Sequence, residues 1–295
     1  MALLIRALCI GAGYKACMPN GSGVYSMLLP SPCNSGILCS RTKVQFCGEC
    51  SLEKFMNYRI RMLLAGIWAG IVTLLVFFVS LVTWGRPFSA WLYARMLGGV
   101  GMRILGIRIK VHGRENLSAE PSVLMANHQS NLDAFFMGAI YPRNTVVLGK
   151  REMLKVPLFG IILLASDNIL VDREDAAGAR KAVSDATDAI KKRGRHLWIF
   201  PEGTRSKGRG LGEFKKGAFI MAIAAQAPII PIVNQDLGHL VNPEQRYLKS
   251  GTHHVKILPA IPTKGLRFRD ADRLIQEISQ IYNQELDNFQ NAVPG

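Results

Sequence analysis

The chain has 295 residues, of which 49% are hydrophobic, enough for one large domain or two small ones with a sizeable core. Its formal net charge of +15 predicts an anionic partner, and charge alone does not choose among a membrane surface, a nucleic acid and a phosphorylated substrate. All six cysteines fall within residues 1–50, which excludes a disulfide-stabilised secreted domain for the main body of the chain.

Residues 1–55 show no steady hydrophobic period and are interrupted by Gly, Pro, Ser and Asn. We interpret them as a disordered or non-native N-terminal extension; in the second case Met56 is the biological start. Cys47 and Cys50 have CxxC spacing, but a zinc site usually needs a second pair or nearby histidines. The nearest histidine in the sequence is His112, so we expect no metal site here.

Residues 62–84 form an uncharged run of 23 residues, and a membrane-crossing helix needs roughly 20. Trp84 stands at its end like an interface anchor. A second, amphipathic helix is expected at 88–106, so residues 56–106 predict a membrane helix plus an amphipathic helix that hold the chain against a bilayer. Arg59 and Arg61 favour a cytoplasmic N-terminus. We expect the following domain on the cytoplasmic face, and whether the helix spans or is partly embedded stays open.

Strand-like and helical segments alternate in residues 107–295, which predicts an α/β domain with a mixed, mostly parallel sheet flanked by helices. The strand-like segments are 107–113, 121–127, 145–149, 168–172, 196–200, 227–233 and 253–262, the last near a sheet edge because of its prolines. The helical segments are 132–141, 174–194, 212–226 and 270–289.

The segment Asn127-His-Gln-Ser-Asn-Leu-Asp133 follows one of these strands. If a tight turn leads into a helix here, Asp133 lies in the first helical turn and its carboxylate can reach the imidazole of His128. A carboxylate on one ring nitrogen leaves the other free to take a proton. This is the base and orienting acid of a hydrolase triad, without a serine nucleophile. The alternative is a capping box, Ser130-x-x-Asp133, with an ordinary loop histidine.

A second polar segment, Phe200-Pro-Glu-Gly-Thr-Arg-Ser206, follows another strand and leads into a basic run. Gly203 lets a backbone approach a ligand closely. Arg205 offers a planar fork that matches phosphate oxygens, and Glu202 can hold that arginine or accept from a ligand hydroxyl. The alternative is a solvated basic loop.

These two segments, Asn-His-x-x-x-x-Asp and Phe-Pro-Glu-Gly-Thr-Arg-Ser, resemble the glycerolipid acyltransferase family. The best match within it is to the 1-acyl-sn-glycerol-3-phosphate acyltransferases, also called lysophosphatidic acid acyltransferases. Two weaker blocks of that family occur in order, residues 148–160 continuing into 168–173, and 229–233. The resemblance covers about residues 107–262 and a membrane-associated N-terminal helical region.

The resemblance implies acyl transfer from an acyl thioester to the free hydroxyl of lysophosphatidic acid, giving phosphatidic acid. It implies His128 as catalytic base and Asp133 as its orienting partner. The implied acceptor- and phosphate-binding residues are Lys155, Arg173, Glu202, Gly203, Thr204 and Arg205. The donor would be acyl-CoA or acyl carrier protein, with no cofactor and no metal. Because the substrate hydroxyl is itself the nucleophile, no acyl-enzyme is needed.

Two competing interpretations stay open at this point. The first is an acyltransferase for another lysophospholipid, glycerol 3-phosphate or an amine-containing lipid. The second is a membrane-anchored protein that binds anionic lipid without catalysis, for which His128 and Asp133 would be dispensable. Aromatic residues are not interleaved with the basic runs, which argues against single-stranded nucleic acid as the partner.

Overall fold

The computed structural model describes residues 18–19, 25–26, 48–130, 132–172, 176–206, 209–242 and 246–292. The chain divides into two compact units, Met1–Arg59 and Ile60–Gly295. In the first unit, β1 (Met18–Pro19) and β2 (Tyr25–Ser26) form an antiparallel pair, and helix α2 (Gly48–Val82) begins. Most of residues 1–55, with five of the six cysteines, lies outside the described residues. The interpretation of this segment as an extension therefore stays a prediction.

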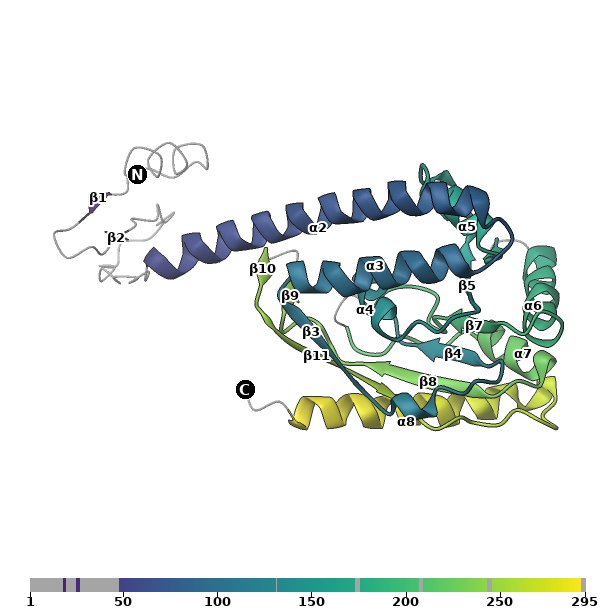
Figure 1. The fold of residues 1–295 in the computed structure, drawn as a ribbon. Helices are drawn as coiled ribbons and strands as arrows, with labels where there is room; N and C mark the ends of the chain where they lie inside the picture. The colour runs from purple at the N-terminus through teal and green to yellow at the C-terminus, as the bar shows by residue number, and fades with distance from the viewer. Residues whose placement is uncertain are drawn as a thin grey trace, which may run out of the picture. The chain divides into compact units, whose positions relative to one another are not determined.

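The second unit contains a seven-stranded sheet with the order β3-β11-β8-β4-β7-β5-β6 (Figure 1). The strands are β3 (Ile107–His112), β4 (Val123–Ala126), β5 (Thr145–Lys150), β6 (Ile169–Val171), β7 (His196–Ile199), β8 (Ile229–Asn234) and β11 (Gly251–Ile257). The five strands from β8 to β6 are parallel, whereas β11 is antiparallel to β8 and parallel to β3. The predicted mixed, mostly parallel sheet is confirmed. Strands β9 (Val241–Asn242) and β10 (Tyr247–Leu248) form a separate short pair.

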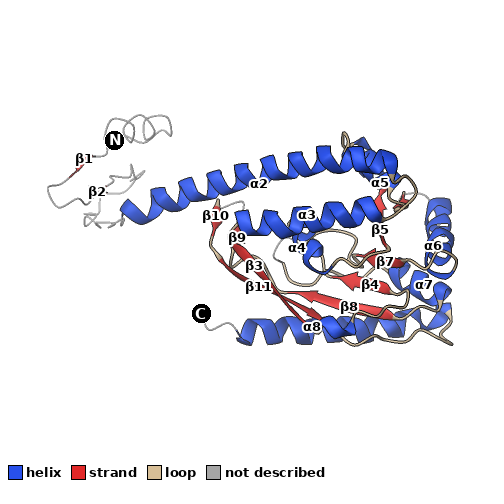
Figure 2. Ribbon diagram, viewed as in Figure 1, coloured by secondary structure: helices blue, strands red, loops and turns tan. Residues whose placement is uncertain are grey.

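Helices cover both faces of this sheet (Figure 2). On one face lie α6 (Ala176–Lys191), α7 (Lys216–Ala225) and α8 (Ala271–Ala292), and on the other lie α3 (Phe88–Ile104) and α4 (Asp133–Ile140). Strand β4 serves both cores, because Val123 and Met125 join the first and Leu124 and Ala126 the second. Burial on both faces explains why the parallel strands are short continuous apolar runs instead of alternating ones.

Several elements differ from the sequence prediction. Helix α5 (Phe159–Ala165) and the 3₁₀ helices η1 (Arg114–Asn116), η2 (Arg151–Lys155) and η3 (Phe268–Asp270) were not predicted. The last predicted strand does lie near an edge, because β11 is second in the sheet and only β3 lies outside it. Pro259 and Pro262, which suggested the edge, follow the end of β11 and take no part in its ladder.

A proline lies instead within β8, where Pro231 is paired with Met125 of β4. Because proline has no backbone N–H, it cannot donate to the ladder. The hydroxyl of Tyr282, from α8, donates to the carbonyl oxygen of Met125 at 2.5 Å and accepts from the N–H of Ile232 at 3.2 Å. Tyr282 thus fixes the end of β4, three residues before His128.

Within the second unit, α2 packs along α3 and α5 through Val72 and Val76, which cluster with Ile162. The indole N–H of Trp68 donates to the carbonyl of Met96, in α3, at 3.0 Å. The opposite side of α2 exposes large apolar side chains at helical spacing: Ile60, Leu63, Ile67, Ile71, Leu74, Phe78 and Leu81. Residues Asn57–Val82 are long and apolar enough to cross a membrane, judged by length and composition alone.

Candidate active site

Two loops meet where the parallel strands β4 and β7 end. The carboxyl ends of neighbouring parallel strands lie on one edge of a sheet, which is where ligands bind in open α/β folds. The loop after β4 carries His128, and the loop after β7 carries residues 200–206. They are joined directly, because the N–H of Ser206 donates to the carbonyl oxygen of His128 at 2.8 Å.

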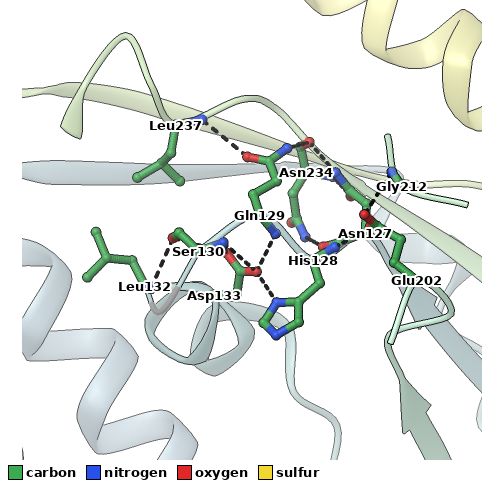
Figure 3. A network of polar contacts seen from close by, with 10 residues as sticks. All are labelled: Asn127, His128, Gln129, Ser130, Leu132, Asp133, Glu202, Gly212, Asn234 and Leu237. Carbon is green, nitrogen blue, oxygen red and sulfur yellow. Dashed lines mark hydrogen bonds and ion pairs between the residues drawn. The ribbon is translucent and has the colours of Figure 1, made fainter. Parts of the chain in front are cut away.

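His128 contacts Asp133 across the turn that leads from β4 into α4 (Figure 3). Asp133 is the first residue of the helix and its side chain is 1% exposed. One carboxylate oxygen, Oδ2, contacts Nδ1 of His128 and also accepts the N–H groups of Gln129 at 2.7 Å and Ser130 at 3.1 Å. Because this oxygen acts as an acceptor, Nδ1 carries the proton and Nε2 is left to accept one. The imidazole stacks on Phe200, with ring centroids 4.1 Å apart.

The predicted capping of α4 is only partly seen. The hydroxyl of Ser130 accepts the N–H of Leu132 at 3.0 Å, and Asn131 lies outside the described residues. The Asp133 carboxylate faces back onto the turn, because it accepts the N–H groups of Gln129 and Ser130. Half of the capping box is therefore present, because the carboxylate accepts the N–H of Ser130, whereas the N–H of Asp133 donates to the backbone carbonyl of Ser130 at 3.3 Å instead of its hydroxyl. The same carboxylate touches the imidazole, so His128 is not an ordinary loop histidine.

Glu202 holds the two loops together and is 3% exposed. Its Oε1 accepts the N–H of His128 at 2.6 Å and its Oε2 accepts the N–H of Gly212 at 2.9 Å (Figure 3). Burial raises the pKa of this carboxyl group, while the two backbone N–H groups act in the opposite direction. Both carboxylate oxygens of Glu202 thus accept backbone N–H groups. The sequence had suggested instead that this carboxylate holds Arg205 or contacts a ligand hydroxyl.

A network of side-chain amides fixes the other side of the turn (Figure 3). Asn127 accepts the N–H of Asn234 at 2.7 Å and donates to its carbonyl oxygen at 3.0 Å. Gln129 donates to the same carbonyl at 2.9 Å and accepts the N–H of Leu237 at 3.2 Å. The network ties the end of β4 to the end of β8. The sequence does not point to Gln129 and Asn234, because only the pairing of β4 with β8 brings them together.

His128 opens into a cavity of about 700 Å³. Of the predicted site residues, Gly203, Thr204 and Arg205 also line it, and Gly203 has a positive φ of 71° that favours glycine. Two basic residues that were not predicted as site residues, Lys150 and Arg209, also line the cavity. Lys150 is the last residue of β5, so it could have been predicted from the rule that ligands bind at the carboxyl ends of parallel strands. The rest of the lining is largely apolar and includes Tyr93, Ala134, Met137, Leu148, Phe159 and Ile162.

Two predicted residues remain, Lys155 and Arg173. Lys155 ends η2, is exposed and does not line the cavity. Arg173 lies outside the described residues, so its role in binding the acceptor phosphate stays a prediction. Among the residues with a described placement, no cluster of three or more His, Cys, Asp or Glu side chains suited to a metal ion is found.

Comparison with known proteins gives consistent matches. A family model described as "Acyltransferase" matches residues 108–235. The 1-acyl-sn-glycerol-3-phosphate acyltransferase of Saccharomyces cerevisiae is 34% identical over 203 residues, 68% of this chain and 66% of that protein. An uncharacterized acyltransferase of Schizosaccharomyces pombe is 32% identical over 263 residues, 84% of this chain and 94% of that protein.

One solved structure, the 1-acyl-sn-glycerophosphate acyltransferase PlsC of Thermotoga maritima, shares the fold. The TM-score is 0.65 at 19% identity, over 83% of this chain and 99% of that one. Relatives from Caenorhabditis elegans and S. cerevisiae are matched over 61% and 66% of their own length, which is less than two thirds. The S. pombe relative is matched over nearly its whole length, and the chain therefore belongs to the acyltransferase family that includes these 1-acyl-sn-glycerol-3-phosphate acyltransferases.

Proposed function

We propose that the protein transfers an acyl chain from an acyl thioester to the free hydroxyl of lysophosphatidic acid, giving phosphatidic acid. One observation carries the proposal. His128, with its Nδ1 held by the buried Asp133, faces a cavity that is mostly apolar and has Lys150, Arg205 and Arg209 on its wall. Such a cavity suits an acyl chain in its apolar part and a phosphate beside its guanidinium and ammonium groups.

The chemistry follows from the free ring nitrogen. Nε2 of His128 takes the proton of the acceptor hydroxyl as its oxygen attacks the thioester carbonyl carbon. The carbon–sulfur bond then breaks, and the imidazolium returns the proton to the departing thiolate. Asp133 keeps the imidazole oriented and stabilises its charged form. Neither a cofactor nor an acyl-enzyme is required, and the donor would be acyl-CoA or acyl carrier protein.

We also propose that the protein works on a membrane with its catalytic domain on the cytoplasmic face. The exposed apolar side of α2 supports this, because it runs along the helix while the other side packs on α3 and α5. The guanidinium of Arg61 donates to the hydroxyl of Ser250 at 2.7 Å, and the N–H of Gly85 donates to the carbonyl of Ala165 at 2.8 Å. A helix held against the domain at Arg61 and just after its last residue suits partial embedding along the segment between these two contacts. The net charge of +15 suits an anionic leaflet.

Thiol release from an acyl-CoA, with and without lysophosphatidic acid, tests the proposal. Detergent-solubilised wild type and His128→Ala should be compared at equal concentration. We expect release that requires lysophosphatidic acid and that falls by about 10²–10⁴ in the variant, because a general base contributes that much to the rate. His239→Ala, at an exposed position, is the matched control and should keep wild-type turnover.

Each other outcome has a definite meaning. Acceptor-dependent release with glycerol 3-phosphate or another lysophospholipid, but not with lysophosphatidic acid, would replace the acceptor named here. Release only from an acylated carrier protein would identify the donor. Equal release by wild type and His128→Ala would show that His128 is not the base and would overturn the mechanism.

A further inference from the structure

A second pocket, of about 320 Å³, lies away from the active site. It is lined by residues that include Asn144, just before β5, and Arg195, just before β7. These two positions are at the amino ends of the parallel strands, whereas His128 follows the carboxyl end of β4. A strand of six residues such as β5 separates the two edges by roughly 20 Å. The pocket is therefore distinct from the cavity at His128.

Three guanidinium groups line this pocket, those of Arg86, Arg143 and Arg195. Arg195 donates to the side-chain oxygen of Asn144 at 3.3 Å, and its Nε lies 3.7 Å from Asp167. The same carboxylate oxygen of Asp167 is paired with Arg193 at 3.1 Å. One acidic group is thus shared between two arginines.

For the other two arginines, the described part of the chain supplies no such neutralising group. Among the described residues, no carboxylate lies within 4.0 Å of Arg86 or Arg143. The guanidinium carbon of Arg143 lies 4.8 Å from the ring centroid of Trp91, which fixes the group over the ring. Guanidinium groups present planar pairs of N–H donors that match phosphate oxygens. The pocket therefore concentrates positive charge that a phosphate group would neutralise.

The chain on both sides of Arg86 exposes large apolar side chains. Arg86 lies in the loop that joins α2 to α3, directly after the apolar helix (Figure 1). In and near this loop Val82 is 88% exposed and Trp84 is 58% exposed. Phe88 and Trp91, which line the pocket, contact each other with ring centroids 5.7 Å apart. Aromatic rings beside arginines are typical of the headgroup region of a bilayer.

We propose that Arg86, Arg143 and Arg195 form a second anion site that binds the phosphate group of an anionic membrane phospholipid. The proposal rests on the membrane attachment proposed above. With α2 embedded through its exposed side, the α2–α3 loop reaches the level of the lipid phosphates. The guanidinium groups then bind the phosphate, and Phe88 and Trp91 contact the glycerol and ester region of the same lipid. The bound lipid would fix the orientation of the domain on the membrane.

Native mass spectrometry of the full chain in detergent micelles tests the site. The micelles contain short-chain phosphatidylglycerol, which is neither the proposed substrate nor the proposed product, or phosphatidylcholine as a zwitterionic comparison. The test variant is Arg86→Gln/Arg143→Gln. The single variant Arg86→Gln changes only an exposed loop residue and so guards against misfolding of the double variant. The matched control, Lys264→Gln/Arg273→Gln, removes the same charge at two exposed positions. Inorganic phosphate is titrated separately.

We expect wild type and control to retain phosphatidylglycerol over phosphatidylcholine, and the double variant to bind it roughly tenfold more weakly. Arg86→Gln should give a smaller loss. Equal binding by wild type and the double variant, or an equal loss in the control, would overturn the site. Displacement of phosphatidylglycerol by inorganic phosphate at equal concentration would replace the lipid with free phosphate as the ligand.

The acyltransfer assay on the same preparations separates this proposal from the proposed function. The double variant should keep wild-type turnover with detergent-dispersed substrates, because the pocket lies at the other edge of the sheet. Loss of turnover together with lipid binding would assign the pocket to the active site and overturn its separate role. Specific lipid binding by a wild type without any acyltransfer would support the site while refuting the proposed function.

Discussion

Glu202 stands out at the scale of single residues, because the sequence suggests a ligand contact and the structure shows backbone contacts. In Glu202→Gln one carboxylate oxygen becomes an amide NH₂, so the N–H of His128 or of Gly212 loses its acceptor. A buried group left unpaired costs about 1–3 kcal/mol, and a displaced His128 lowers the rate. We expect kcat to fall roughly tenfold or more with an unchanged KM for the acceptor.

Steady-state kinetics with varied acceptor checks this expectation. Glu213→Gln is the matched control, since Glu213 lies in the same loop region with its side chain 84% exposed. A raised KM with an unchanged kcat in Glu202→Gln would instead support the direct contact with substrate that the sequence suggested.

Lys150 and Lys155 make a second comparison between residues, because only Lys150 lines the cavity. If Lys150 contacts the acceptor phosphate, Lys150→Ala removes a charge-assisted interaction and should raise the KM for the phosphorylated acceptor roughly tenfold. Lys155→Ala should leave that KM unchanged, because Lys155 is exposed outside the cavity. Measurement of both KM values under identical conditions decides between them. A raised KM in Lys155→Ala and an unchanged KM in Lys150→Ala would show that Lys155, and not Lys150, binds the acceptor.

At the scale of elements, α3 and α4 pack through glycine. A Cβ atom built on Gly98 of α3 would lie 2.2 Å from the carbonyl oxygen of Phe135, in α4. Because α4 begins at Asp133, any displacement of this helix moves the partner of His128. A Cβ built on Gly99, the next residue, meets no atom within 4 Å. Replacement by alanine should therefore affect stability very differently at these two adjacent glycines.

We expect Gly98→Ala to destabilise the fold by about 1–3 kcal/mol through overpacking, and to lower acyltransfer as well. Gly99→Ala should be neutral or stabilising by up to about 1 kcal/mol, because alanine favours the helix. Thermal unfolding of both variants in detergent, followed by the thiol-release assay, makes the comparison. Equal unfolding temperatures for Gly98→Ala and wild type would mean that the two helices separate without penalty.

The Gly98 contact also shows how far local pattern carries prediction. Hydrophobic period and strand-end polarity predicted the strands of the seven-stranded sheet, the long helices and the turn that brings Asp133 to His128, because these depend on neighbours in sequence. The two-residue strands β9 and β10 were not predicted. The approach of Gly98 to Phe135, the bonds from Glu202 and the amide network of Asn234 depend on which strands and helices become neighbours. Which strands and helices become neighbours depends on residues far apart in sequence, so a local hydrophobic period cannot predict these contacts. Helix α5 was missed because its seven residues are too few to show a helical period.

The pH dependence of stability is a property of the whole molecule, and His253 gives it a definite sign. This side chain is fully buried, stacks on Phe136 and has no hydrogen-bond partner for either ring nitrogen among the described residues. Burial, followed by the nearby His239 and His254, lowers the pKa of His253 to about 3. In the unfolded chain the same imidazole titrates at about 6.5.

Between these two values the unfolded chain binds a proton at His253 that the folded protein does not. The free energy of unfolding therefore falls as the pH drops from about 6.5 towards about 3, by up to about 1.4 kcal/mol per pH unit. His253→Leu removes this group at similar volume. We expect the loss of Tm between pH 7.5 and pH 5 to be smaller in His253→Leu than in wild type by about 4–8 °C. His239→Leu removes only one of the two charges that add to the effect of burial, so it should reduce the wild-type difference less than His253→Leu does. Identical differences in wild type and His253→Leu would show that His253 takes up its proton in the folded state as readily as in the unfolded chain.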